Sequence, residues 1–249
     1  MNGWARKHGD LGAAAGRIRA AAVSQAAAGR RFIGSVLGQL RPWHSLREHQ
    51  WDDHVADLNR FVDSLRSKQN GFVPYVSPEF GGREARVLLL NLSPGKGTDP
   101  AQGGSGFLSL RNPDGAAERL GEGIVAAGLP ADNCVAWKIY PWYMRGLSDK
   151  PATERRNHMA VGFPLLRDLF DLLPELRVVV AFGEDAKEGW DGFRRMYPTT
   201  AKRVRMLGNR STADRAYITR SQAQIEQWRS ELIDTLELAK KHAAGPKRG

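Results

Sequence analysis

The chain has 249 residues, of which 41% are hydrophobic and 26% charged, a balance typical of a globular protein with one sizeable core. Its single cysteine, Cys134, excludes an internal disulfide framework and an all-cysteine zinc or iron–sulfur site. No stretch of eighteen apolar residues is present, so we expect no membrane span. With one cysteine and no such span, a reducing, cytoplasmic location is the default prediction.

Basic residues outnumber acidic ones by 37 to 27, which gives a net charge of +10. This excess favours a polyanionic partner, because a basic surface gains affinity by releasing the counterions held around phosphates. An arginine-rich proteome is the alternative explanation of the same excess. The charge therefore favours a nucleic-acid partner. We also expect a monomer that does not bind membranes.

Residues 1–42 differ in composition from the rest of the chain. They are rich in Ala and Gly, and Asp10 is their one acid. Their basic residues include Arg6, Lys7, Arg17, Arg19, Arg30 and Arg31. Alanine favours a helix over 13–28, but this stretch has almost no apolar face with which to dock. We interpret residues 1–42 as a loosely ordered basic arm, or as an artefact of start-site choice, residues 43–242 as the folded domain, and residues 243–249 as a basic tail.

The first helix of the domain is predicted to begin at Ser45, where Ser45 and Glu48 have the spacing of a capping box. Apolar residues then recur at helical spacing at Trp51, Val55, Leu58, Val62 and Leu65. Asn70 and Gly71 are predicted to end this helix.

Strands and helices alternate after this point. Apolar runs predict strands at Arg86–Leu92, Cys134–Tyr140, Arg177–Phe182 and Lys202–Leu207. Helices are predicted at about Pro113–Ala127, from Pro151 onward, around Trp190, and from Ser221, where Gln224 completes a second capping box. The pattern predicts an α/β fold: a three-layer α/β/α arrangement around a central, mainly parallel four-stranded sheet.

Ligands of such folds bind at the carboxyl ends of the strands, so the loops there are the ones that matter. The first contains Asn91 and then Ser93-Pro94-Gly95; it lacks the glycine of a phosphate-binding P-loop, because that position is Leu90. It is either a tight turn that presents backbone N–H groups or a purely structural turn. Phe107, in a glycine-rich segment of the same loop, is either an aromatic that stacks on a flat ligand or a core residue.

Lys138 is the informative residue of the second loop region, because a lysine in an apolar strand needs a cavity, an anion or a carboxylate partner. The loop after the fourth strand carries Arg210 and Arg215, which suit phosphate contacts, although a solvated surface explains them as well. No histidine, cysteine and carboxylate cluster has metal-ligand spacing, so we predict neither a metal nor a cofactor.

In this order the segments resemble the uracil-DNA glycosylase superfamily, in particular an uncharacterised bacterial branch, over roughly residues 50–240. The similar segments are Val73-Pro74, Gly81–Leu90, Ser93-Pro94-Gly95, Ser105-Gly106-Phe107, Asn112-Pro113-Asp114, Trp137 with Pro141-Trp142-Tyr143, and Val178–Gly183 with Ala186. The resemblance implies an enzyme that flips a base out of DNA and holds it at the strand ends.

The same resemblance implies roles for individual residues. Phe107 corresponds to the aromatic that stacks on the base. Leu92 and Ser93 occupy the places of the acidic residue or asparagine that orients water, and Asn91 is a displaced substitute. Lys138 stands where related chains have the asparagine that reads the base, for which Asn133 is a weaker candidate. Asn209-Arg210-Ser211 stands in place of a His-Pro-Ser loop, and Arg210, Ser211 and Arg215 are the implied DNA-binding residues.

Three positions that carry the chemistry of the superfamily therefore differ in this chain, which leaves three interpretations. The first is an active glycosylase with an altered pocket, in which Lys138 faces an anionic, carbonyl-rich or modified base or forms a Schiff base with the sugar. The second is an inactive module that binds nucleic acid or a nucleotide on the same fold. The third is a small-molecule or protein-binding role unrelated to DNA, since a fold does not determine function.

Overall fold

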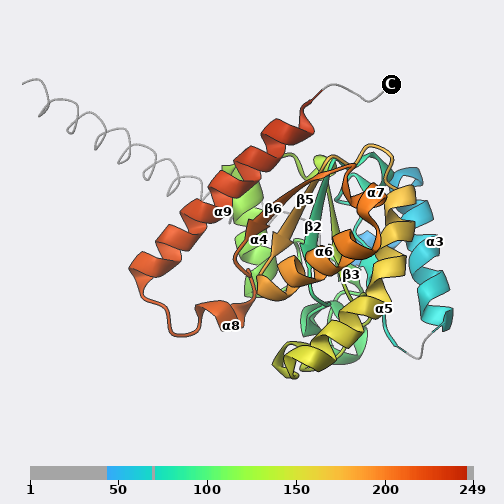
Figure 1. The fold of residues 1–249 in the computed structure, drawn as a ribbon, viewed down its shortest axis with the longest axis horizontal. Coiled ribbons are helices and arrows are strands. Elements are labelled where there is room, and N and C mark those ends of the chain that lie inside the picture. The colour runs from blue at the N-terminus through green and yellow to red at the C-terminus, as the bar shows by residue number, and fades with distance from the viewer. Residues whose placement is uncertain (1–43, 69–70, 246–249) are drawn as a thin grey trace, which may run out of the picture. The chain divides into compact units, whose positions relative to one another are not determined.

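A computed structural model describes residues 44–68 and 71–245 (Figure 1). The predicted basic arm and residues 246–249 of the predicted tail lie outside these residues. Four parallel strands form the main sheet in the order β4-β2-β5-β6. Their bounds are β2 Val87–Asn91, β4 Cys134–Lys138, β5 Val178–Phe182 and β6 Arg205–Asn209. The predicted α/β class and the predicted parallel four-stranded sheet are confirmed.

Burial explains why these segments are strands. The first four residues of β2 and all five of β5 are buried, as expected for parallel strands that are covered on both faces. β6 lies at one edge of the sheet, where β5 is its neighbour on one side. Four of its five residues are exposed or only partly buried. The prediction started β6 three residues too early: residues 202–204 form the turn that follows the short helix α7 (Pro198–Ala201).

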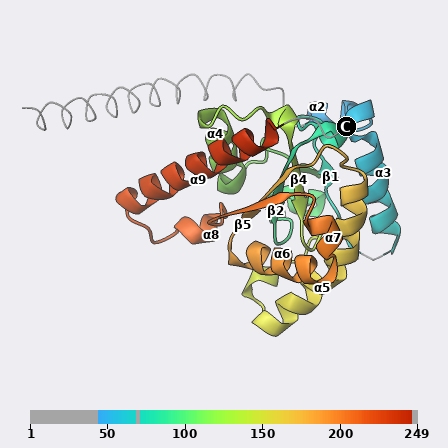
Figure 2. The ribbon, with the colours of Figure 1, turned by 45° about the horizontal axis from the view of Figure 1, so that its top comes forward.

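Helices cover both faces of the sheet (Figures 1 and 2). On one face lie α4 (Gly115–Ala126) and α9 (Gln222–Ala243), and on the other lie α5 (Ala152–Asp171) and α6 (Glu184–Met196). The predicted capping box of Ser221 and Gln224 is present at the start of α9, which buries Leu232, Leu236, Ala239 and Ala243. The short helix α8 (Asp214–Tyr217) precedes α9. The described residues also form 3-10 turns at Gly82–Glu84, Lys96–Thr98, Pro100–Gln102, Ala131–Asn133 and Leu147–Asp149.

The prediction of one helix that starts at Ser45 is wrong. The structure has α2 (His44–Glu48) and, after a break, α3 (Asp53–Lys68). A turn in which the Asp52 N–H donates to the His49 carbonyl separates them, and acidic Asp53 begins α3, where the helix dipole favours a negative charge. Trp51 falls in this break and is 44% exposed, whereas the rest of the predicted stripe is fully buried: Val55, Leu58, Val62 and Leu65.

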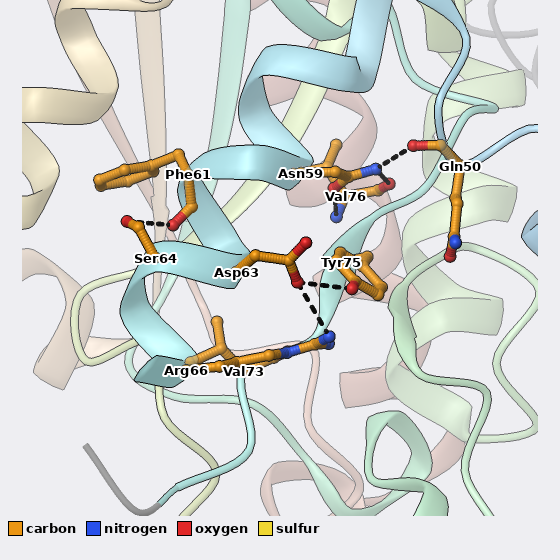
Figure 3. A network of polar contacts seen from close by, with 9 residues as sticks. All are labelled: Gln50, Asn59, Phe61, Asp63, Ser64, Arg66, Val73, Tyr75 and Val76. Carbon is orange, nitrogen blue, oxygen red and sulfur yellow. Dashed lines mark hydrogen bonds and ion pairs between the residues drawn. The ribbon is translucent and has the colours of Figure 1, made fainter. Parts of the chain in front are cut away.

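A second, two-stranded sheet was not predicted. It pairs β1 (Tyr75–Val76) with β3 (Phe107–Leu108), and α3 anchors it through a polar network (Figure 3). The Asn59 side chain donates to the Val76 carbonyl at 3.2 Å and accepts from the Val76 N–H at 2.9 Å. It thus pairs with the backbone of β1 as a neighbouring strand would. Arg66 donates to the Val73 carbonyl and lies 3.8 Å from the centre of the Tyr75 ring, which fixes the segment that enters β1.

No helix in residues 44–68 or 71–245 is both long enough and apolar enough to cross a membrane.

Candidate functional site

Lys138 and Asn91 meet where β4 and β2 end. They are register partners, and the Lys138 Nζ donates to the Asn91 Oδ1 at 3.2 Å. Both side chains are half-buried at the carboxyl edge of the sheet, where parallel α/β folds bind their ligands. The structure thus brings together two of the predicted site residues, which end two strands and are 47 positions apart in sequence.

The amine of Lys138 is easier to deprotonate than that of an ordinary lysine. Burial lowers the pKa of Lys138 from 10.5 to about 8, because the charged form loses hydration among apolar neighbours. The Asp114 carboxylate opposes this effect and raises the pKa. Near pH 8, about half of the molecules therefore carry an uncharged Lys138 amine, which is a nucleophile and a proton acceptor.

Asp114 is the acidic group of this site, and sequence reasoning did not assign it a role. It is the N-cap of α4, where its Oδ1 accepts from the Ala117 N–H at 2.9 Å. Its Oδ2 faces the loop after β2, since a Cβ added to Gly97 would lie 2.6 Å from it. An aspartate before a helical pattern is a signal for a helix cap. That signal does not show that the Asp114 carboxylate acts on Lys138, because this depends on how the chain between β2 and α4 folds.

A shallow recess lies beside Lys138. It is lined by Val73, Pro74, Leu108, Trp137, Lys138 and Pro141. The space between these residues is about 140 Å³ when the part open to solvent is included. The enclosed part is too small for a water molecule. In this conformation the recess is therefore too narrow for a planar base, and one wall must move before a base can enter.

Two walls of the recess are held by the contacts already described. Arg66 and Asn59 fix the chain at either end of residues 73–76, and the pairing of β1 with β3 places Leu108 opposite. Trp137 stacks on Phe61 of α3, with ring centres 5.9 Å apart, and its indole N–H is buried without a hydrogen-bond partner. A ligand that supplied an acceptor to this N–H would remove the cost of leaving it unpaired.

Phe107 does not line the recess. Its side chain is 1% exposed and its ring lies 5.9 Å from that of Tyr75, so it is packed in the core in this conformation. Its backbone is held by the Ser105 hydroxyl and the Asn112 amide. The predicted stacking role would need Phe107 to move, and the role stays a prediction.

The other two residues predicted near the base lie at different distances from Lys138. Ser93 is half-buried, two residues beyond the end of β2, and so belongs to the same edge of the sheet. Asn133 precedes β4, and its carbonyl accepts from the Arg86 N–H before β2 begins. Asn133 therefore lies at the amino edge, about 16 Å of strand away from Lys138.

Asn209 ends β6 and is used by the fold. Its side-chain nitrogen donates to the Glu231 carbonyl at 3.0 Å and to the Thr235 hydroxyl at 2.7 Å, both on α9, and its Oδ1 accepts from the Arg210 N–H. The residue is 8% exposed. Because β6 is the third strand from β4, Asn209 lies about 14 Å from Lys138 across the sheet.

The predicted DNA-binding arginines are paired with acids of the same molecule. Arg210 lies 2.9 Å from a Glu231 carboxylate oxygen and 4.9 Å from the centre of the Trp228 ring. Arg215, in α8, lies 3.1 Å from Asp149, at the end of the 3-10 turn after β4, and 3.9 Å from Asp185, in the first turn of α6. The Ser211 hydroxyl accepts from the Ala213 N–H. Arg210 and Arg215 are each about half exposed, so a phosphate would compete with these carboxylates.

The net charge is not spread evenly over the chain. Basic residues exceed acidic ones by six in residues 1–43 and by two in residues 246–249, which leaves an excess of two for the residues that the structure describes. The folded body is thus close to neutral. Most of the basic excess therefore belongs to residues 1–43 and 246–249 rather than to the part of the chain that holds Lys138.

No protein-family model matches the chain, and a search of curated proteins finds no match. Within residues 44–68 and 71–245, no group of three or more His, Cys, Asp and Glu side chains is placed to hold a metal ion. The polar groups that define the chemistry of the site are Lys138, Asn91 and Asp114.

Proposed function

We propose that this chain is a uracil-DNA glycosylase-like protein that binds DNA and excises a damaged or modified base by hydrolysis of its N-glycosidic bond. The observation that carries the proposal is the pair of Lys138 and Asn91 at the ends of two neighbouring parallel strands. This is the edge at which such folds bind ligands, and it is where the sequence resembles that superfamily. The parallel four-stranded sheet with helices on both faces is consistent with the proposal.

Hydrolysis of an N-glycosidic bond is favoured by two charges at the site. The base leaves as an anion, while the sugar develops positive charge, so a cationic donor and a nearby carboxylate lower the two costs separately. A protonated Lys138 supplies the donor, and Asp114 supplies the negative charge that Leu92 and Ser93 do not. Asp114 also suits the role of a base that takes a proton from the attacking water.

The second candidate is a module that binds a nucleotide or nucleic acid and leaves it intact. The observation that favours it is the structural use of Asp114, whose Oδ1 already caps α4. A carboxylate with one oxygen engaged has less freedom to accept a proton from water. The recess beside Lys138, narrow as it is, then binds a smaller group or opens upon binding.

Base release separates the two candidates. The full chain is incubated with end-labelled oligonucleotides that each contain one uracil, hypoxanthine, xanthine or hydroxymethyluracil, and abasic sites are cleaved with alkali. Our proposal predicts cleavage of at least one oligonucleotide, reduced roughly 100-fold or more in Lys138→Ala and in Asp114→Asn. The asparagine variant keeps the helix cap, so its loss of activity reports the charge.

The same mixtures are run on native gels at two salt concentrations. A salt-sensitive shift without cleavage of any oligonucleotide would support the binding module and overturn the enzyme. Neither a shift nor cleavage would overturn both candidates and favour a role unrelated to DNA.

A further inference from the structure

Lys138 has the features of a lysine that reacts with carbonyl groups. It lines a recess whose other members are apolar, its Nζ has one hydrogen-bond acceptor at 3.2 Å, and that acceptor is a neutral amide oxygen rather than a carboxylate. Most other lysines and arginines of the described body are on the surface, and many of them form ion pairs; Lys187, for example, lies 2.8 Å from Glu184. An amine surrounded in this way is not locked in its charged form.

A small carbonyl needs less room beside Lys138 than a base does. The closed part of the recess does not hold a water molecule, so a wall must move for either ligand, but an open-chain aldehyde has to reach only the Nζ, whereas a base also has to fit its ring. An abasic deoxyribose, the sugar that remains after a base is removed, carries such an aldehyde at C1′. Asp114 is placed on the same edge of the sheet, in the electrostatic field of Lys138, with its Oδ2 turned toward the loop after β2.

We propose that Lys138 forms an imine with the C1′ aldehyde of an abasic site in DNA and that Asp114 then promotes β-elimination of the 3′ phosphate. This second activity rests on the proposed function only for its substrate class, which is DNA. It requires no base release by this protein, because the abasic site can be supplied ready-made.

The steps balance without an oxidant or a reductant. The Lys138 nitrogen adds to C1′, and the carbinolamine loses water to give a protonated imine. The Asp114 carboxylate accepts a proton from C2′, the electron pair forms the C2′–C3′ double bond, and the C3′–O bond breaks, which releases a strand that ends in phosphate. Water then hydrolyses the imine, which restores the amine and frees the unsaturated aldehyde.

The test uses the full chain and an oligonucleotide with one preformed abasic site. Sodium borohydride reduces the imine to a stable amine, so a covalent protein–DNA adduct forms if the imine exists. We expect the adduct with the unaltered protein and with Lys187→Ala, a fall of roughly tenfold or more with Lys138→Ala, and peptide mapping that places the adduct on Lys138. Without borohydride, Asp114→Asn should still form the imine but should cleave the strand roughly 100-fold more slowly.

Peptide mapping of the unaltered protein keeps the test decisive even if Lys138→Ala does not fold. An adduct that maps to another amine, or no adduct at pH 8, would overturn the proposal. Adduct formation without release of any base in the oligonucleotide panel would leave the lyase standing and overturn the glycosylase. Base release without an adduct would do the reverse.

Discussion

The two ends of the sheet's carboxyl edge hold similar polar residues, which differ in how many hydrogen-bond and ion-pair partners they have within the protein. At β4 and β2, Lys138 and Asn91 share one hydrogen bond, and the lysine is held at a lowered pKa. At β6, Asn209 forms three hydrogen bonds, and the arginines that follow are paired with carboxylates. The first pair stays available for a ligand, whereas the second group stabilises the attachment of α9 to the sheet.

The largest effect on stability is expected at the β6 end. Asn209→Ala removes a buried amide that serves the Glu231 carbonyl, the Thr235 hydroxyl and the Arg210 N–H, and it leaves these groups without that partner. We expect a loss of about 2–3 kcal/mol in the free energy of unfolding, measured by urea denaturation.

The matched control is Asn91→Ala, an asparagine at the corresponding end of β2. Asn91 contributes its side chain to one hydrogen bond, from Lys138, so its loss should lower stability by about 1 kcal/mol or less. Equal effects of the two substitutions would show that the two ends of the edge do not differ in the way we describe.

The next effect is a dependence of stability on pH at Lys138. Lys138→Met removes an amine whose pKa is about 8 in the folded state and 10.5 as a model value. Below pH 8 the fold bears the cost of burying the charged amine, about 3 kcal/mol, against about 1 kcal/mol lost with the hydrogen bond to Asn91. We therefore expect the variant to be more stable than the unaltered protein by about 2 kcal/mol at pH 7.

This advantage should shrink as the pH rises. Between pH 8 and 10.5 the unfolded chain binds more protons at Lys138 than the folded chain does, so the unaltered protein gains stability relative to the variant. Urea denaturation of both proteins at several pH values isolates Lys138, because the other groups titrate in both. A difference that does not change from pH 7 to 10.5 would contradict the lowered pKa.

The smallest effect is expected at Arg215. Its pairs with Asp149 and Asp185 lie at the surface, where its own side chain is 50% exposed. Arg215→Ala should reduce stability by less than about 1 kcal/mol in thermal unfolding at low salt, and by less again at high salt, because ions screen such pairs. A loss of several kcal/mol would mean that the fold depends on this arginine to hold α8 against the turn after β4 and the start of α6.

The sheet was predictable from the sequence because its signal is local. The continuous apolar runs of β2 and β5 predict strands that are buried on both faces. Ser221 and Gln224 form a capping box, a local pattern that marks the start of α9. The break between α2 and α3 was missed because helical spacing continues across it. The break is a turn, and the spacing of the apolar residues does not reveal it.

The candidate site was predictable only in part. Lys138 was identified because a lysine in an apolar strand needs an explanation, and strand order alone then brings Asn91 beside it. Asp114 and the pairing of the arginines were not predictable, because both depend on the folding of distant loops. Arg215 and Asp149, for example, are 66 positions apart. Phe107 is buried because β3 pairs with β1, a contact with no signal in the sequence pattern.

The comparison of the two ends is tested most directly by measuring base release with three proteins side by side: the unaltered chain, Lys138→Ala and Arg210→Ala. We predict that the unaltered chain releases one of the bases in the oligonucleotide panel, that Lys138→Ala loses this activity roughly 100-fold or more, and that Arg210→Ala stays within roughly threefold. Activity that survives in Lys138→Ala but is lost in Arg210→Ala would place the chemistry at the β6 end and contradict the proposed role of Lys138.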